Sequence, residues 1–246
     1  EIKNIGSTIM ICNYLNDLPI AGHLQTKILT HNALKEIKND RKVDHIFFIG
    51  HSAGSYFLNN IAKENGDGFI QLGSVLNSNG ILPWEKESLF NYPIPVLTLL
   101  GEKDGYMNPF LAKDELENTK FLENPYLKPV IIEKQVNHLQ ISDNKETKYA
   151  KIFNKEDIKS KISIEEAQED LTDTISEFIV TCLNKDYKSD ILNKKINKKK
   201  EIIKIYDLEK CDLKSLSTSI QYDIINPLFY QDIPINNTVY SDKTEF

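Results

Sequence analysis

Short runs of apolar residues, bounded by glycine, proline or polar turn residues, recur along the chain. Runs of this length that are apolar throughout are typical of strands buried on both faces of a parallel sheet. We therefore predict about five buried strands. They cover residues 7–14, 45–50, 68–74, 94–101 and 128–134.

Longer stretches between these runs carry apolar residues at helical spacing, and several have recognisable end signals. Gly66 closes one predicted helix, and Asn108 with Pro109 opens another. Ser163 and Glu166 match a capping box at the start of the last helix. The predicted helices cover residues 25–40, 54–65, 109–121 and 164–182. Strands that alternate with helices predict the α/β class, a mostly parallel sheet flanked by helices.

The regular pattern ends after the last predicted helix. We expect one folded domain over residues 1–185 and a C-terminal extension over residues 186–246, in which a Lys-rich linker precedes an irregular tail. The Lys cluster is interpreted as a solvated helix end or linker rather than a surface for anions, because the chain has a net charge of −6.

Composition excludes several classes of function. A chain of 246 residues with net charge −6 lacks the basic face that a general nucleic-acid binder needs. No apolar run reaches the length of a transmembrane helix. The three cysteines contain no CxxC pair, and no His or carboxylate cluster has the spacing of a metal site. We therefore expect no nucleic-acid partner, no membrane-spanning segment and no metal.

The most informative stretch lies where the second predicted strand meets a helix. Residues 50–54 read Gly-His-Ser-Ala-Gly, which fits the G-x-S-x-G pattern of a nucleophile elbow. Such a tight turn strains the serine backbone, and the N-terminus of the following helix directs N–H groups at charge that develops near the hydroxyl. The same pattern also occurs in turns without chemistry. The strand before it and the helix after it favour Ser52 as a nucleophile.

A serine nucleophile needs a base, and the base needs an acid that orients it. Asp104 follows the fourth predicted strand and His138 follows the fifth, so both lie at carboxyl ends of strands, where open α/β sheets bind ligands. The order serine, acid, histidine is the one found in α/β-hydrolases. Glu102 is an alternative acid. His51 is interpreted as a packing residue, because it cannot reach its neighbour's hydroxyl in good geometry.

These motifs resemble those of the α/β-hydrolases, and the resemblance covers roughly residues 7–184. The stretch FIGHSAGS is similar to the elbow of lipase- and esterase-like members, PVLTLLGEKDG to the acid strand and loop, and VNHLQ to the histidine loop. A narrower likeness is to an esterase/lipase-like branch that is distantly chlorophyllase-like. The resemblance implies Ser52 as nucleophile, His138 as base and Asp104 as its orienting acid. It also implies a small-molecule or lipid-like carboxylic ester as substrate and no cofactor.

The chain departs from the family pattern at the oxyanion hole. The Ala53 N–H is one assignable donor, but the chain has no His-Gly pair to supply the second, and Ser55 stands where many relatives have glycine. We expect the second donor and further N-terminal strands upstream of Glu1, so that this chain alone is nearly inactive and prone to aggregate. The alternative location for the donor is residues 13–21. The competing function is a non-catalytic binding protein that keeps the hydrolase fold without a complete oxyanion hole.

Overall fold

The computed structural model describes residues 19–40, 43–76, 89–107, 109–112, 119–141, 157–184 and 187–197. The first predicted strand, at residues 7–14, and the tail beyond residue 197 lie outside these residues. The described part contains the other four predicted strands and all of the candidate catalytic residues.

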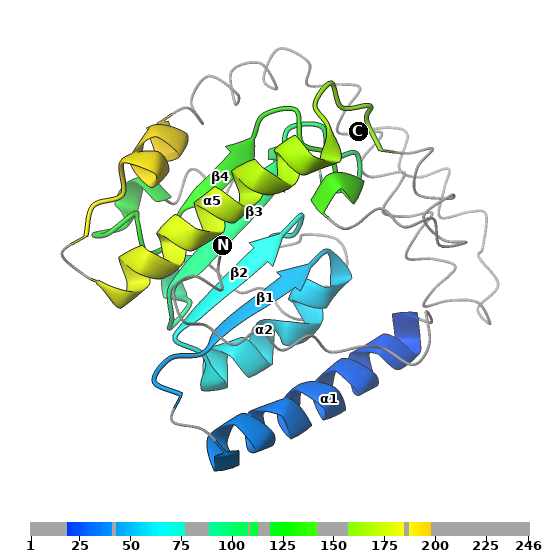
Figure 1. The fold of residues 1–246 in the computed structure, drawn as a ribbon, viewed down its shortest axis with the longest axis vertical. Helices are drawn as coiled ribbons and strands as arrows, with labels where there is room; N and C mark the ends of the chain where they lie inside the picture. Colours follow the sequence, from blue (N-terminus) through cyan, green and yellow to red (C-terminus); the bar gives the residue numbers. More distant parts are fainter. Residues whose placement is uncertain are drawn as a thin grey trace, which may run out of the picture.

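The described strands form one four-stranded sheet with the order β1-β2-β3-β4, in which every neighbouring pair is parallel (Figure 1). Their positions and parallel pairing confirm the α/β class. Because all of these strands run in the same direction, the turns that follow them lie together at the carboxyl ends of the strands. The strands are β1 (Phe47–His51), β2 (Gly68–Leu72), β3 (Val96–Gly101) and β4 (Val130–Glu133).

The burial of the strands explains their sequences. β2, β3 and β4 are buried along their whole length, which accounts for apolar runs that do not alternate with polar residues. β1 differs because it lies at one edge of the described sheet, and its Ile49 side chain is 43% exposed.

Helices cover both faces of the described sheet (Figure 1). α2 (Ala53–Asn65) packs on one face with α1 (Pro19–Asp40) against it, and α5 (Ile164–Leu183) packs on the other. α1 begins before the predicted start at residue 25, with Pro19 at its first position, where proline is well suited to a helix. Among the described helices, none is long and apolar enough to cross a membrane.

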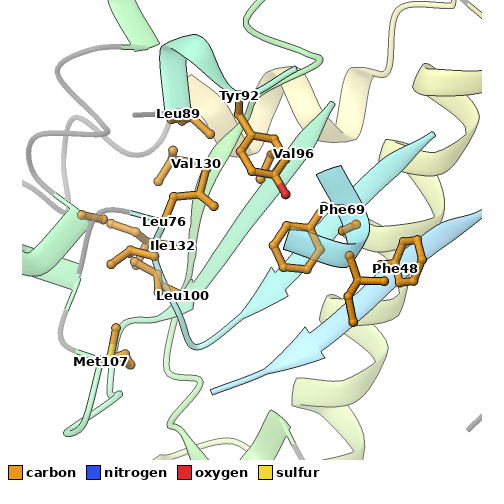
Figure 2. Close-up of a cluster of buried hydrophobic side chains, with 14 of the residues drawn as sticks. Phe48, Phe69, Leu76, Leu89, Tyr92, Val96, Leu100, Met107, Val130 and Ile132 are labelled. Carbon is orange, nitrogen blue, oxygen red and sulfur yellow. The ribbon is translucent and has the colours of Figure 1, made fainter. Parts of the chain in front are cut away.

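Two apolar clusters join the sheet to these helices. On the α2 face, Phe69 of β2 belongs to a cluster with Leu34 of α1 and Ile61 of α2, and Figure 2 shows the strand residues of this cluster. On the α5 face, Ile70 of β2 belongs to a second cluster with Phe178 of α5. Neighbouring residues on one strand thus serve opposite layers, as the two-residue period of a strand requires.

Two of the predicted helix ends are present in the structure. The Ser163 hydroxyl accepts a hydrogen bond from the Glu166 N–H at 3.1 Å, which confirms Ser163 as the N-cap of α5. Gly66 ends α2, and its N–H donates to the Ala62 carbonyl at 2.8 Å. Gly66 has φ −104°, so it closes the helix in an extended rather than a left-handed conformation.

The predicted helix over residues 109–121 differs from the observed structure. Its two described ends are 3-10 turns, η3 (Pro109–Ala112) and η4 (Thr119–Phe121), while residues 113–118 lie outside the described part. Two other 3-10 turns are η2 (Leu89–Asn91), before β3, and η5 (Leu139–Ile141), after β4.

A short helix over residues 190–197 lies within the segment that the sequence assigns to a linker. Leu192 is fully buried in the cluster on the α5 face. Lys195 Nζ lies 2.6 Å from Glu133 Oε1 at the end of β4 and also donates to Thr174 Oγ1 of α5. These contacts pack the helix onto the domain, and the Lys195 ammonium is in an ion pair rather than on a solvated helix end.

Candidate active site

Ser52 lies in the turn between β1 and α2, and its backbone is strained. Its φ is 52° and its ψ is −128°, a combination that residues with a side chain rarely adopt. Such a conformation costs about 1–3 kcal/mol and persists only where the surrounding structure fixes it. Serine at an N-cap usually accepts a hydrogen bond from the helix, but the Ser52 hydroxyl makes no such bond. The hydroxyl is therefore available for chemistry.

Close packing of α2 against β1 explains the first glycine of the motif. A Cβ added at Gly50 would lie 2.5 Å from Cα and 2.7 Å from N of Ser55, so the helix could not approach the strand. The second glycine, Gly54, is different, because an added Cβ would meet nothing within 4 Å in the described structure. Only Gly50 is thus required by packing.

Asp104 and His138 form a buried pair in the turns after β3 and β4. His138 Nδ1 lies 2.7 Å from Asp104 Oδ2, and the two residues are 5% and 0% exposed. The other carboxylate oxygen, Oδ1, accepts hydrogen bonds from the N–H groups of Tyr106 at 2.9 Å and Met107 at 2.6 Å. These bonds fix the carboxylate. With Nδ1 on the carboxylate, Nε2 is the ring nitrogen that remains to act as a base.

The surroundings of His138 favour its protonated form. Burial alone lowers the pKa of His138, but the charge of Asp104, the hydrogen bond to it and the charge of Asp157 together outweigh burial and raise the pKa above its usual value. A raised pKa makes His138 a stronger base. The same carboxylates stabilise the imidazolium that would form when His138 accepts a proton.

His51 packs against His138, with ring centroids 4.7 Å apart. Burial, and then the charge of His138, lower the pKa of His51 to about 3, so its ring stays neutral near pH 7. Its Nε2 atom has no hydrogen-bond partner among the described residues. These features support the interpretation of His51 as a packing residue beside His138.

The turn after β2 connects the backbone of Ser52 with the buried pair. The Ser52 N–H donates to the carbonyl of Leu72, the last residue of β2, at 2.9 Å. Gly73 follows, and a Cβ added there would lie 3.0 Å from His138 Nδ1 and 3.2 Å from Asp104 Oδ2. Within the described contacts, no hydrogen bond joins the Ser52 hydroxyl to His138. Catalytic hydrogen bonds are often long in structures without substrate and tighten when the substrate binds.

Glu102, the alternative acid, is hydrogen-bonded to Gln135. Its Oε2 accepts hydrogen bonds from Gln135 N at 2.9 Å and from Gln135 Nε2 at 3.0 Å. These bonds hold the turn after β4 against the turn after β3. The geometry therefore favours Asp104 over Glu102 as the partner of His138.

Two polar residues that the sequence did not single out anchor the histidine loop. Asn137 N donates to Gln140 Oε1, and Gln140 N donates to Asn137 Oδ1, both at 3.0 Å. Their amide nitrogens then bond to the carbonyls of Ile158 at 3.1 Å and Ile162 at 2.9 Å, in the segment before α5. The asparagine and glutamine on either side of His138 in VNHLQ are a signal that could have indicated this anchor.

Ala53 is the first residue of α2, so its N–H has no acceptor within the helix. The positive end of the helix dipole lies at the same point and favours negative charge there. In the alternative location for a second donor, residues 13–18 lie outside the described part and residues 19–21 belong to α1. In the part that the structure describes, no group of three or more His, Cys, Asp or Glu residues could hold a metal ion.

Comparison of the chain with models of protein families, with curated proteins and with solved structures found no match in any of the three. The interpretation of the site therefore depends on its own geometry and chemistry.

Proposed function

We propose that the chain is a serine hydrolase of the α/β-hydrolase fold that cleaves a carboxylic ester. Ser52 is the nucleophile, His138 is the general base and acid, and Asp104 orients His138. The observation that carries the proposal is the strained backbone of Ser52. No N-cap hydrogen bond between the Ser52 hydroxyl and the helix accounts for this strain. Strain of this kind clusters at active sites. A nucleophile elbow needs it in order to present the hydroxyl at the tip of a strand.

In the proposed reaction, Ser52 Oγ attacks the ester carbonyl carbon while His138 Nε2 takes the hydroxyl proton. Negative charge develops on the carbonyl oxygen, beside the Ala53 N–H and the N-terminus of α2. The bond to the alcohol oxygen then breaks, and His138 gives its proton to the leaving alcohol. Water attacks the acyl-serine while His138 takes a proton from it, which releases the carboxylic acid and restores the Ser52 hydroxyl.

The surroundings of the pair suit this proton shuttle. The Asp104 carboxylate is held by two backbone N–H groups as well as by His138, so it can keep the imidazole in one orientation through both steps. His51 does not compete for the proton, because its lowered pKa keeps it neutral.

Hydrolysis of a panel of acyl esters of varied chain length by the full natural protein tests the proposal. We expect turnover of at least one ester, and Ser52→Ala should abolish it while circular dichroism shows an unchanged fold. Unchanged turnover in Ser52→Ala would exclude Ser52 as the nucleophile. Absence of turnover for every ester by a folded wild-type protein would instead favour the binding protein. A thioester of the preferred acyl chain, tested in parallel, distinguishes an esterase from a thioesterase.

A further inference from the structure

Asp157 connects the two loops that carry Asp104 and His138. Its Oδ1 accepts a hydrogen bond from the N–H of Gly105 at 2.9 Å. Its Oδ2 accepts one from the N–H of Leu139 at 2.9 Å. Gly105 directly follows Asp104, and Leu139 directly follows His138. One carboxylate therefore holds the backbone next to both members of the pair.

We infer that Asp157 is a positioning residue that sets the placement of His138 against Asp104 by bridging their loops, an inference that rests on the proposed function. Asp157 acts through the backbone of Gly105 and Leu139 and not on a reacting atom.

The pair lies beyond the regular part of the sheet, where the bonds between Glu102 and Gln135 also join the two turns and the Asp157 bridge acts directly beside the pair. The pairing of β3 with β4 ends at Gly101 and Glu133, so it stops before either member of the pair. The segment that supplies Asp157 is itself held in place, because Asn137 Nδ2 donates to the Ile158 carbonyl at 3.1 Å. The bridge is thus anchored on the same loop that it positions.

The charge of Asp157 adds to its geometric effect. The groups that face His138 are Asp104, Asp157, the neutral ring of His51 and the ring of Tyr106. Of these, the two carboxylates raise the pKa of His138. Loss of the Asp157 charge should therefore lower that pKa. A residue that only stabilised the fold would leave the pKa of His138 unchanged.

Titration of the His138 ring by NMR in the full natural protein tests the inference without the need for turnover. Asp157→Asn keeps the size of the side chain but removes its charge and places an N–H group against a backbone N–H. We expect this variant to lower the pKa of His138. Asp67→Asn is the matched control, because Asp67 also accepts a backbone N–H, from Ile46 at 2.8 Å, at an exposed turn. An unchanged pKa in folded Asp157→Asn would overturn the inference even if no ester were hydrolysed.

Ester turnover provides a second test. We expect Asp157→Asn to reduce kcat roughly 10²-fold with little change in KM, because misplacement of reacting groups by about 1 Å has this effect. In an Asp104→Asn background the further loss should be much smaller, since residues that act as a unit do not contribute independently. Equal fold losses in both backgrounds would show that Asp157 acts independently of the pair and would contradict the inference.

Amide hydrogen exchange in the wild-type protein tests the bridge even if Asp157→Asn does not fold. We expect the N–H groups of Gly105 and Leu139 to exchange far more slowly than exposed amides, because both are bonded to the Asp157 carboxylate. Exchange of either amide at the rate of an exposed one would show that the bridge does not hold the two loops, and the inference would fail.

Discussion

Gly73 and His138 follow different strands, yet a Cβ added at Gly73 would lie 3.0 Å from both Nδ1 and Cε1 of the His138 ring. Gly73 has φ 54°, and its N–H donates to the carbonyl of Leu99 in β3 at 2.8 Å. Glycine is therefore favoured here both by the backbone conformation and by the lack of space. The turn after β2 therefore packs directly against the Asp104–His138 pair.

Gly73→Ala should displace His138 from Asp104, because the buried ring and the fixed carboxylate have little room to move. We expect ester turnover to fall roughly 10²-fold in a protein that remains folded, as measured by kcat/KM together with circular dichroism. Gly54→Ala is the control, since an added Cβ there would meet nothing within 4 Å in the described structure. Equal turnover in Gly73→Ala and wild type would show that the turn at Gly73 does not position the pair.

Asp104→Asn should reduce turnover on the order of 10⁴-fold, the effect of the equivalent change in serine proteases, because the imidazole is left in the wrong tautomer. Glu102→Gln should have a much smaller effect, since Glu102 bonds to Gln135. A harmless Asp104→Asn together with a severe Glu102→Gln would reassign the acid.

The pH profile of the wild-type protein gives a second readout of the pair. In the proposed reaction His138 must be neutral, and its pKa is raised above the ordinary value of 6.5, so the acid limb of kcat/KM should lie above pH 6.5.

The strain at Ser52 predicts opposite effects of substitution at two serines that start helices. Ser52→Gly should raise the free energy of unfolding by about 1 kcal/mol, because glycine adopts this positive φ without strain. Ser163→Ala should lower it by about 1 kcal/mol, because the N-cap hydrogen bond to Glu166 is lost. Urea denaturation measures both changes. Destabilisation by Ser52→Gly would contradict the assignment of strain to this residue.

His51 should make the protein less stable in acid. The unfolded chain binds a proton on His51 below about pH 6.5, whereas the folded protein excludes it until about pH 3. The unfolded state thus holds more protons in this window, and the free energy of unfolding falls as the pH is lowered through it. His51→Gln should make that fall less steep. Identical slopes in His51→Gln and wild type would contradict a buried neutral His51.

The sheet could be predicted because its strands are buried on both faces. Complete burial of β2, β3 and β4 requires continuous apolar runs, and these runs are visible in the sequence. Parallel pairing then brings the turns after them to one edge. This is why Asp104 and His138, 34 residues apart in the chain, could be expected to meet.

Other features leave no pattern in the sequence. The Asp157 bridge is made to backbone N–H groups, which every residue except proline has, so nothing at positions 105 or 139 marks the partners. Lys195 lies within a run of lysines, and its ion pair with Glu133 follows only from how the helix over residues 190–197 packs. Gly73 falls inside the strand predicted over residues 68–74, whereas the observed β2 ends at Leu72, and its contact with His138 depends on the tertiary structure.

Peptide mapping after reaction with a fluorophosphonate tests the central claim most directly, because this probe forms a covalent bond with an activated serine. In the full natural protein, the adduct should be found on Ser52. In folded His138→Ala, which lacks the base, Ser52 should remain unlabelled. Labelling that is absent from Ser52 in the folded wild-type protein, or that is equally strong in His138→Ala, would contradict the assignment of Ser52 and His138 as nucleophile and base.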